Sequence, residues 1–202
     1  MKNLIFIASR GNNVGKSTTA KLYSERNILT SEIYSFATPI RNCCNDIFKN
    51  KYEFDKKFTD YYNIRELKND LIENHFNVKS FTELQGITFR EFLNNFSTNM
   101  TITNGKEIWA KKALSHIEQS DNDLILIDDF RRSTEIDYLI KNLDSQNYNI
   151  ITIYLIKDLV QNQVKTEYEG LLEDYKFDIV FSINNDYSNI DDLLKIIDNK
   201  II

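Results

Sequence analysis

The chain is poor in residues that cross-link or interrupt a fold: its 202 residues include two cysteines, one proline and five glycines. The cysteines, Cys43 and Cys44, are adjacent, which is poor geometry for a structural disulfide and lacks the C-x-x-C spacing of redox and zinc sites. The two histidines, His75 and His116, stand apart from each other and from the cysteines. We therefore expect reduced cysteines in packing roles and no zinc site.

Long apolar runs are also absent, and no stretch approaches the roughly 20 residues that span a membrane. The first apolar stretch is only about five residues long, which is too short for the core of a signal peptide. We therefore expect a cytoplasmic protein, in the host cytoplasm if it is viral, with no membrane partner.

Basic residues are in the minority, with 25 Lys and Arg against 30 Asp and Glu and a formal net charge of −5. Because Lys and Arg form no long block, the chain lacks the electrostatic footprint of a protein that binds duplex nucleic acid. A nucleotide monomer remains compatible, since it needs only a local basic cleft. A content of 42% hydrophobic and 27% charged residues is typical of a globular domain, and 202 residues fit a single α/β domain.

A phosphate-binding pattern follows the first apolar segment. Residues 4–8 are predicted to form a buried parallel strand, and Gly15-Lys16-Ser17 opens a helix whose first N–H groups and dipole favour phosphate. In the pattern G-x-x-x-x-G-K-[ST], backbone amides wrap the phosphates, the lysine reaches the β and γ oxygens, and the hydroxyl ligates magnesium. We therefore predict ATP and Mg²⁺ as ligands, with the nucleotide held by Gly11, Asn13, Val14, Gly15, Lys16, Ser17 and Thr18.

The pattern is imperfect, because the position of its first glycine holds Arg10 and Gly11 lies one residue later. Either Arg10 tolerates the entry dihedrals and Gly11 takes the positive φ, or the loop is one residue tighter. The alternative without function is an ordinary strand-to-helix turn with a chance lysine.

Four further apolar segments combine strand character with turn signals, at 32–36, 123–128, 149–156 and 177–183. Between them, apolar residues at mixed spacings of three and four predict helices at 40–49, 61–74, 88–99, 106–119, 133–142, 160–174 and 190–199. Alternating strands and helices indicate parallel crossovers. The predicted fold is a three-layer α/β domain of the P-loop type, with a mainly parallel five-stranded sheet flanked by helices.

The strand at 123–128 ends in Asp128-Asp129 and is expected to deliver carboxylates to the carboxyl edge of the sheet, where open α/β folds bind ligands. A carboxylate at this place can hold the magnesium shell opposite Ser17. The competing interpretation is a solvated strand end or the cap of the following helix.

Six further segments follow one another in an order that is known from one protein family. They are Ser35 to Arg41, Thr88 to Leu93, Phe96 to Met100 with Trp109 downstream, Asp129 to Glu135, Thr166 to Glu169, and Ile183 to Asp186. Together with the phosphate loop, they resemble the phage-type deoxynucleoside monophosphate kinases over most of the chain. The resemblance implies ATP-dependent phosphorylation of a deoxynucleoside monophosphate, with an acceptor-binding insertion at about 37–110 and a lid at about 157–175, where Lys157 or Lys165 supplies positive charge. It is compatible with a homodimer.

The resemblance also assigns roles to individual residues. Lys16, Arg131 and Asp129 are the catalytic candidates, and Ser17 and Asp129 are the metal candidates. The acceptor is expected to contact Phe36, Arg41, Arg90, Trp109, Asp128, Arg131 and Glu135. Guanidinium groups suit a phosphate because they bind its oxygens bidentately, although each arginine alone is equally compatible with a surface ion pair.

Four departures from the family pattern leave the activity open. Arg10 replaces a glycine, Ser97 replaces another, an expected arginine is absent from 101–104, and a basic residue is absent from 152–154 in the strand before the lid. A P-loop kinase of another small acceptor, such as dephospho-coenzyme A, and a nucleotide-binding module without turnover are the competing functions.

Overall fold

The structure is a computed structural model, and it describes residues 1–9, 14–129, 132–157, 172 and 175–201. The chain forms two compact units. Unit 1 consists of Met1–Phe36 and Trp109–Ile202, and unit 2 of Ala37–Ile108. The acceptor-binding insertion was expected at about 37–110, and unit 2 covers 37–108. The binding role of this unit stays a prediction.

Unit 1 is built on a sheet in which every paired strand is parallel, with the order β2-β3-β1-β4-β5 in the described part of the chain. The central strand β1 pairs with β3 on one side and with β4 on the other. The strands are β1 (Lys2–Ser9), β2 (Ser31–Tyr34), β3 (Leu124–Ile127), β4 (Tyr148–Ile156) and β5 (Ile179–Ser182). The predicted parallel five-stranded sheet is therefore confirmed.

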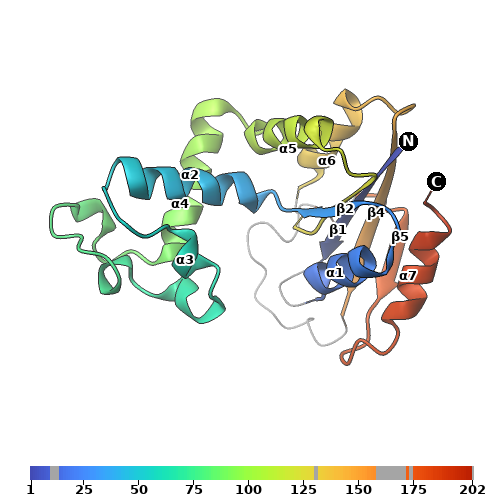
Figure 1. Cartoon of the computed structure of the whole chain (residues 1–202), viewed down its shortest axis with the longest axis horizontal. Helices are drawn as coiled ribbons and strands as arrows, with labels where there is room; N and C mark the ends of the chain where they lie inside the picture. The colour runs from blue at the N-terminus through green and yellow to red at the C-terminus, as the bar shows by residue number, and fades with distance from the viewer. Residues whose placement is uncertain (10–13, 130–131, 158–171, 173–174, 202) are drawn as a thin grey trace. The chain divides into compact units, whose positions relative to one another are not determined.

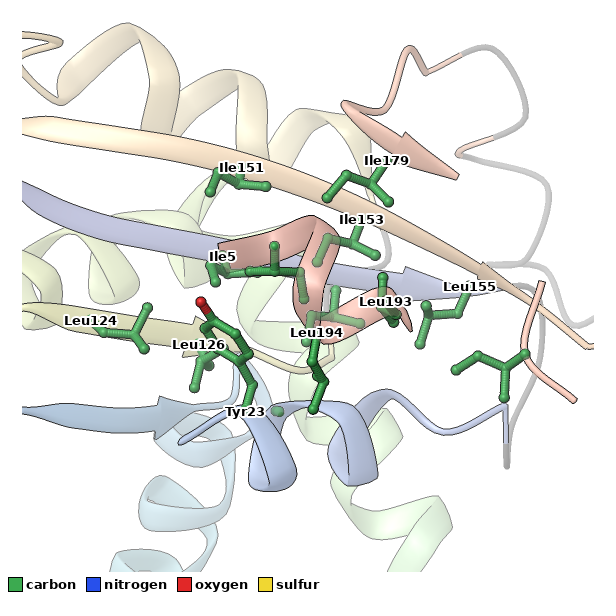
Figure 2. Close-up of a cluster of buried hydrophobic side chains, with 14 of the residues drawn as sticks. Ile5, Tyr23, Leu124, Leu126, Ile151, Ile153, Leu155, Ile179, Leu193 and Leu194 are labelled. Atoms are coloured by element: carbon green, nitrogen blue, oxygen red, sulfur yellow. The ribbon is translucent and has the colours of Figure 1, made fainter. Parts of the chain in front are cut away.

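Helices cover both faces of this sheet. Figure 1 shows α1 (Lys16–Arg26) and α7 (Ile190–Asp198) on one face, with α5 (Ile108–Gln119) and α6 (Ser133–Asn142) on the other. In Figure 2, Ile5, Leu126 and Ile153 of the strands gather with Tyr23 of α1 and Leu194 of α7 in one buried cluster. Because side chains alternate along a strand, the intervening buried residues of β1 and β3 lie on the opposite face of the sheet.

Unit 2 is helical and has an aromatic core of its own. The ring of Phe48 lies 5.2–5.4 Å, centroid to centroid, from four phenylalanine rings at interplanar angles of 67–83°, those of Phe54, Phe58, Phe76 and Phe92. Such edge-to-face geometry suits the quadrupoles of the rings. The elements are α2 (Ala37–Asn50), α3 (Thr59–Tyr62), η1 (Arg65–Asn69), η2 (Ile72–Asn74), η3 (Thr82–Leu84) and α4 (Phe89–Asn104), the η elements being 3₁₀ helices.

The helix predicted over 61–74 is wrong, because the structure has the end of α3 and two short 3₁₀ helices in this range. Backbone groups here bond to a distant segment: Leu71 bridges Thr88, Ile72 N donates to Ile87 O at 2.9 Å, and Phe89 N donates to Asp70 O at 3.2 Å. These long-range bonds compete with the helical ones. The other predicted helices agree within a few residues, except that of 160–174, which lies almost entirely outside the described residues. Within the described ranges, no helix is long and apolar enough to cross a membrane.

Candidate functional site

A left-handed glycine stands directly before helix α1. Gly15 has φ 106° and ψ 9°, and its carbonyl oxygen accepts a hydrogen bond from Thr19 N at 2.8 Å. L side chains rarely adopt this conformation, so the predicted phosphate loop has a physical need for glycine here. Arg10, Gly11 and Asn13, which the sequence also placed in the loop, lie outside the described residues.

Tyr187 lies against this glycine. A Cβ atom added to Gly15 would lie 2.7 Å from Cε1 of Tyr187, a distance that real Cβ atoms do not tolerate. Nζ of Lys157, at the end of β4, lies 4.4 Å from the centroid of the tyrosine ring and donates to its hydroxyl at 3.4 Å. The segment after β5 therefore packs directly on the predicted phosphate loop.

Lys16, Ser17 and Thr18 occupy the first turn of α1. Lys16 is half-buried, and its Nζ donates to Oγ of Ser9, the last residue of β1, at 2.7 Å. Ser17 and Thr18 are exposed, and no side chain caps the start of this helix because Gly15 is the N-cap. The ammonium, two hydroxyls and the first helical N–H groups thus lie together at one strand end, and they are the donor types that bind a polyphosphate.

The acidic pair follows the strand next to β1. Phe6 of β1 is in register with Ile127 of β3, and Asp128 and Asp129 come directly after Ile127. Since β1 and β3 are parallel, Asp129 and the start of α1 lie at the same edge of the sheet, the edge at which open α/β folds bind ligands. The acidic pair therefore follows a strand that pairs with β1, while the metal and substrate roles of Asp128 and Asp129 stay predictions.

The carboxylate of Asp129 is engaged by the end of β2. Its Oδ2 accepts from Oγ of Ser35 at 2.5 Å, and its Oδ1 accepts from the backbone N of Phe36 at 2.7 Å. The pKa of the buried Tyr34 phenol is raised, mainly by burial and next by the negative charge of Asp129. Asp129 thus holds the segment from which the chain leaves unit 1.

Two of the predicted acceptor contacts are buried aromatics. Phe36 is 5% exposed and lies edge-on to Tyr34 with 6.4 Å between the ring centroids. Trp109 is 3% exposed, and its Nε1 has no hydrogen-bond partner among the described residues. Burial to this degree favours packing over direct stacking on a base.

The remaining candidates of unit 1 follow β3. The amide N of Asp128 donates to Tyr34 O at 3.3 Å, which ties the end of β3 to β2. Glu135 is 8% exposed, and its Oε2 accepts from Arg132 N at 3.2 Å at the start of α6, so this carboxylate caps a helix. Arg131 lies outside the described residues, as does most of the predicted lid, including Lys165.

Arg41 and Arg90 belong to one basic cluster in unit 2. The pKa of Lys68 is lowered, first by burial of its ammonium and then by the positive charges of Arg90, Arg41 and Arg65. Nη2 of Arg41 donates to Oγ1 of Thr38 at 3.3 Å, and Nζ of Lys68 lies 5.0 Å from the ring centroid of Tyr62. The two predicted acceptor arginines are therefore accompanied by two cations that the sequence interpretation missed.

The spacing of Arg65 and Lys68 gives no specific sequence signal. Side chains at i and i+3 are eclipsed on a 3₁₀ helix such as η1, but they also share one face of an α-helix such as the one predicted over 61–74. The nearness of η1 to the start of α4 depends instead on the long-range bonds between 70–72 and 87–89. Tyr187 had no local signal either, because its position depends on contact with Gly15 across the fold.

The residues present fit a magnesium ion that is bound together with a nucleotide. The described residues contain no group of three or more His, Cys, Asp or Glu side chains placed to hold a metal. Magnesium in phosphate-transfer sites keeps several water ligands and uses one or two protein oxygens plus phosphate oxygens, so a protein cage is not required. The exposed Ser17 hydroxyl, with Asp129 at the same edge of the sheet, meets this smaller requirement.

No family model matches the chain, and no curated protein sequence matches it. The tunicamycin resistance protein of Deinococcus radiodurans is similar in structure, with a TM-score of 0.47 and 12% identity over 100% of this chain and 96% of that one. A provisionally assigned kinase from Chloroflexus aurantiacus has a TM-score of 0.46 and 10% identity, covering 98% and 94%. A provisionally assigned plasmid partition protein from Borrelia burgdorferi, bound to AMPPNP, has a TM-score of 0.39 and 19% identity, covering 99% of both chains. At TM-scores below 0.5 these likenesses carry no functional conclusion, which depends on the residues of the chain itself.

Proposed function

We propose that this chain is an ATP-dependent kinase that phosphorylates deoxynucleoside monophosphates to diphosphates. The observation that carries the proposal is the turn at Gly15-Lys16-Ser17, which presents a left-handed glycine, an ammonium and a hydroxyl at the carboxyl edge of a parallel sheet. The deoxynucleotide acceptor comes from the family resemblance of the sequence.

In this proposal the donor triphosphate binds at the start of α1. Lys16 turns from Ser9 to the β and γ phosphates, and the first N–H groups of α1 bind phosphate oxygens with the support of the helix dipole. Magnesium, held by Ser17 and the ATP phosphates, would supply charge neutralisation on the transferred group, with Asp129 orienting its water ligands. Phosphoryl transfer needs in-line positioning and charge stabilisation rather than a covalent intermediate, so these residues suffice for the donor half.

The acceptor monophosphate is assigned to Arg41 and Arg90 of unit 2, with Arg131 as a further candidate. Guanidinium groups keep their charge when water is excluded and bind phosphate oxygens through two donors. The bonds from Ser35 and Phe36 to Asp129 fix the residues that immediately precede α2, the helix that carries Arg41. Asp129 is therefore also a positioning residue for Ser35 and Phe36, the residues that follow β2.

The test is ATP consumption in a coupled assay with the four common deoxynucleoside monophosphates, with dephospho-coenzyme A and without acceptor. We expect ADP formation that depends on a deoxynucleoside monophosphate. Lys16→Ala should lower kcat/KM about 10²-fold or more, because it removes a charge aimed at the transferring group. Lys21→Ala is the matched control in the same helix, since Lys21 only forms an exposed pair with Glu25 at 3.8 Å.

Each alternative has its own result. ADP formation with dephospho-coenzyme A alone would replace the acceptor class, and ATP binding without acceptor-dependent turnover would show a binding module. Unchanged transfer in Lys16→Ala would remove the phosphate loop from the mechanism.

A further inference from the structure

The loop 183–189 joins β5 to α7 and carries a tyrosine in a strained conformation. Tyr187 has φ 60°, and it is one of two residues other than glycine with a positive φ among the residues that the structure describes. An L side chain is disfavoured in this left-handed region, and residues held there persist only where the surrounding structure fixes them. The conformation of Tyr187 therefore needs support from the rest of the loop.

Hydrogen bonds supply this support. The backbone of Tyr187 is bonded in both directions, since its N donates to Asn184 O at 3.0 Å and its O accepts from Ile190 N at 3.1 Å. The side chain of Asn189 ties the loop to β5, because its Oδ1 accepts from Asn184 N at 2.9 Å and its Nδ2 donates to Ser182 O at 2.8 Å. The loop thus fixes the place from which the tyrosine ring projects.

The ring of Tyr187 contacts both the phosphate loop and the end of β4. Its Cε1 and Cδ1 atoms lie 2.7 and 3.6 Å from the position that a Cβ atom of Gly15 would take. Nζ of Lys157 lies 4.4 Å from the centroid of the ring, within the range of a cation–π contact. The ring also packs against the buried core cluster of unit 1. These contacts leave the ring little freedom to move away from the glycine.

Gly15 does not select the observed conformation by itself. Glycine populates positive and negative φ about equally, whereas the turn before α1 has φ 106° at this residue. A ring packed on the glycine restricts the rotation of its backbone. Because a site that is ordered before its ligand arrives loses less entropy on binding, this restriction favours ligand affinity.

We propose that Tyr187 is a positioning residue for the donor nucleotide. Its ring holds Gly15 in the left-handed conformation in the free protein, so that the turn at the start of α1 is ordered before a triphosphate binds. The loop 183–189 and Lys157 act through Tyr187, because they fix its backbone and its ring. The inference rests on the proposed function, since it takes the turn at Gly15 to bind the donor triphosphate.

The test is isothermal titration of the full chain with AMPPNP, a non-hydrolysable analogue of ATP, in the presence of Mg²⁺. Tyr187→Ala should weaken binding about fivefold to thirtyfold, the factor that corresponds to ordering the backbone of one residue. Tyr187→Phe should bind within about threefold of the wild type, because the ring and its contact with Lys157 remain. In the kinase assay, Tyr187→Ala should raise the KM for ATP and leave the KM for the acceptor unchanged.

Two further variants separate positioning from a general loss of stability. Phe181→Ala removes another half-buried ring that packs against the same core cluster, so it should lower stability in urea and keep the AMPPNP affinity of the wild type. Asn189→Ala keeps the tyrosine ring but removes two bonds of the loop, so it should weaken AMPPNP binding by a smaller factor than Tyr187→Ala. If Tyr187→Ala does not fold, an unchanged affinity in Asn189→Ala overturns the inference.

A double variant tests the contact itself. If the ring acts through Gly15, the losses of AMPPNP affinity in Gly15→Ala and Tyr187→Ala should not multiply when the two are combined, because both disrupt one contact. Losses that multiply would overturn the inference. So would an unchanged affinity in Tyr187→Ala, an equal loss in Phe181→Ala, or a wild type that does not bind AMPPNP.

Failure of this inference is distinguishable from failure of the proposed function. AMPPNP binding that depends on Tyr187, without phosphoryl transfer to any acceptor, would keep the positioning role and remove the kinase activity. Phosphoryl transfer in which Tyr187→Ala has the KM for ATP of the wild type would do the opposite.

Discussion

Gly15 meets two separate demands, a positive φ and the close approach of Tyr187. Gly15→Ala should therefore cost about 2–5 kcal/mol of unfolding free energy, the sum of backbone strain and overpacking. Gly86→Ala is the matched control, because Gly86 has φ +70° but nothing within 4 Å of an added Cβ. It should cost only the strain, about 1–2 kcal/mol. Urea unfolding measures both, and equal costs would show that the contact with Tyr187 is unimportant.

Asp129 combines a positioning role with a predicted metal role, and two substitutions separate them. Asp129→Ala leaves the Phe36 amide and the Ser35 hydroxyl without their acceptor, and should destabilise the protein by about 1–3 kcal/mol. Asp129→Asn can keep both bonds, since its oxygen accepts from Phe36 and its amide donates to Ser35, so its cost should be smaller.

Activity distinguishes the two roles further. If Asp129 orients the water ligands of magnesium, Asp129→Asn should need a higher Mg²⁺ concentration for half-maximal turnover. Asp121→Ala, at an exposed carboxylate before β3, should leave stability and Mg²⁺ dependence unchanged. An Asp129→Asn variant with the Mg²⁺ response of the wild type would confine Asp129 to positioning.

Helix α4 begins with a reciprocal cap. Oγ1 of Thr88 accepts from Glu91 N at 3.1 Å, and Oε2 of Glu91 accepts from Thr88 N at 2.9 Å. Thr88→Ala should cost about 1 kcal/mol in urea unfolding, because the cap satisfies helical N–H groups that have no other partner. Thr98→Ala, an exposed threonine inside the same helix, should be neutral or slightly stabilising.

The same cap gives a dependence on pH. Hydrogen bonds from the backbone and then the side chain of Thr88 lower the pKa of Glu91 from its ordinary value of 4.5. A carboxyl group whose pKa is lowered in the folded state stabilises the protein fully above pH 4.5, the pKa of the unfolded state. This stabilisation is lost as the pH falls through the pKa of the folded state. Thr88→Ala keeps the backbone bond to Glu91 and loses only the bond from the hydroxyl. The stability difference between Thr88→Ala and the wild type should therefore shrink in part below pH 4.5, and a constant difference would contradict the contribution of the Thr88 hydroxyl.

The elements that the sequence predicted well are those whose pattern is local. The apolar runs of β1 and β3 are buried on both faces, so their composition alone predicted buried parallel strands. The segment 61–74 has apolar residues at helical spacing, yet its bonds to Ile87 and Phe89 replace helical ones. Pairing over such a distance leaves no periodic signal, and the placement of Arg65 and Lys68 was missed for the same reason.

The division of the chain into two units was accessible only in part. Phosphate-loop spacing predicts the start of α1, and the family resemblance predicts an insertion between β2 and α5. The number of phenylalanines in 48–92 does not by itself reveal a second core, because the ring contacts join five separate positions. A core that closes within unit 2 implies that its stability is partly independent of the sheet.

Phe48 is fully buried at the centre of that second core, so Phe48→Ala should cost about 3–5 kcal/mol within unit 2. Native-state hydrogen exchange should then accelerate in α2 and α4 while the amides of β1 and β3 keep the protection of the wild type. Leu194→Ala is the reciprocal variant, since Leu194 packs in the core of unit 1. It should accelerate hydrogen exchange in β1 and β3 and leave exchange in α2 and α4 unchanged. If either substitution raised exchange equally throughout both units, the chain would open as one cooperative body, and unit 2 would not be a separable unit of stability.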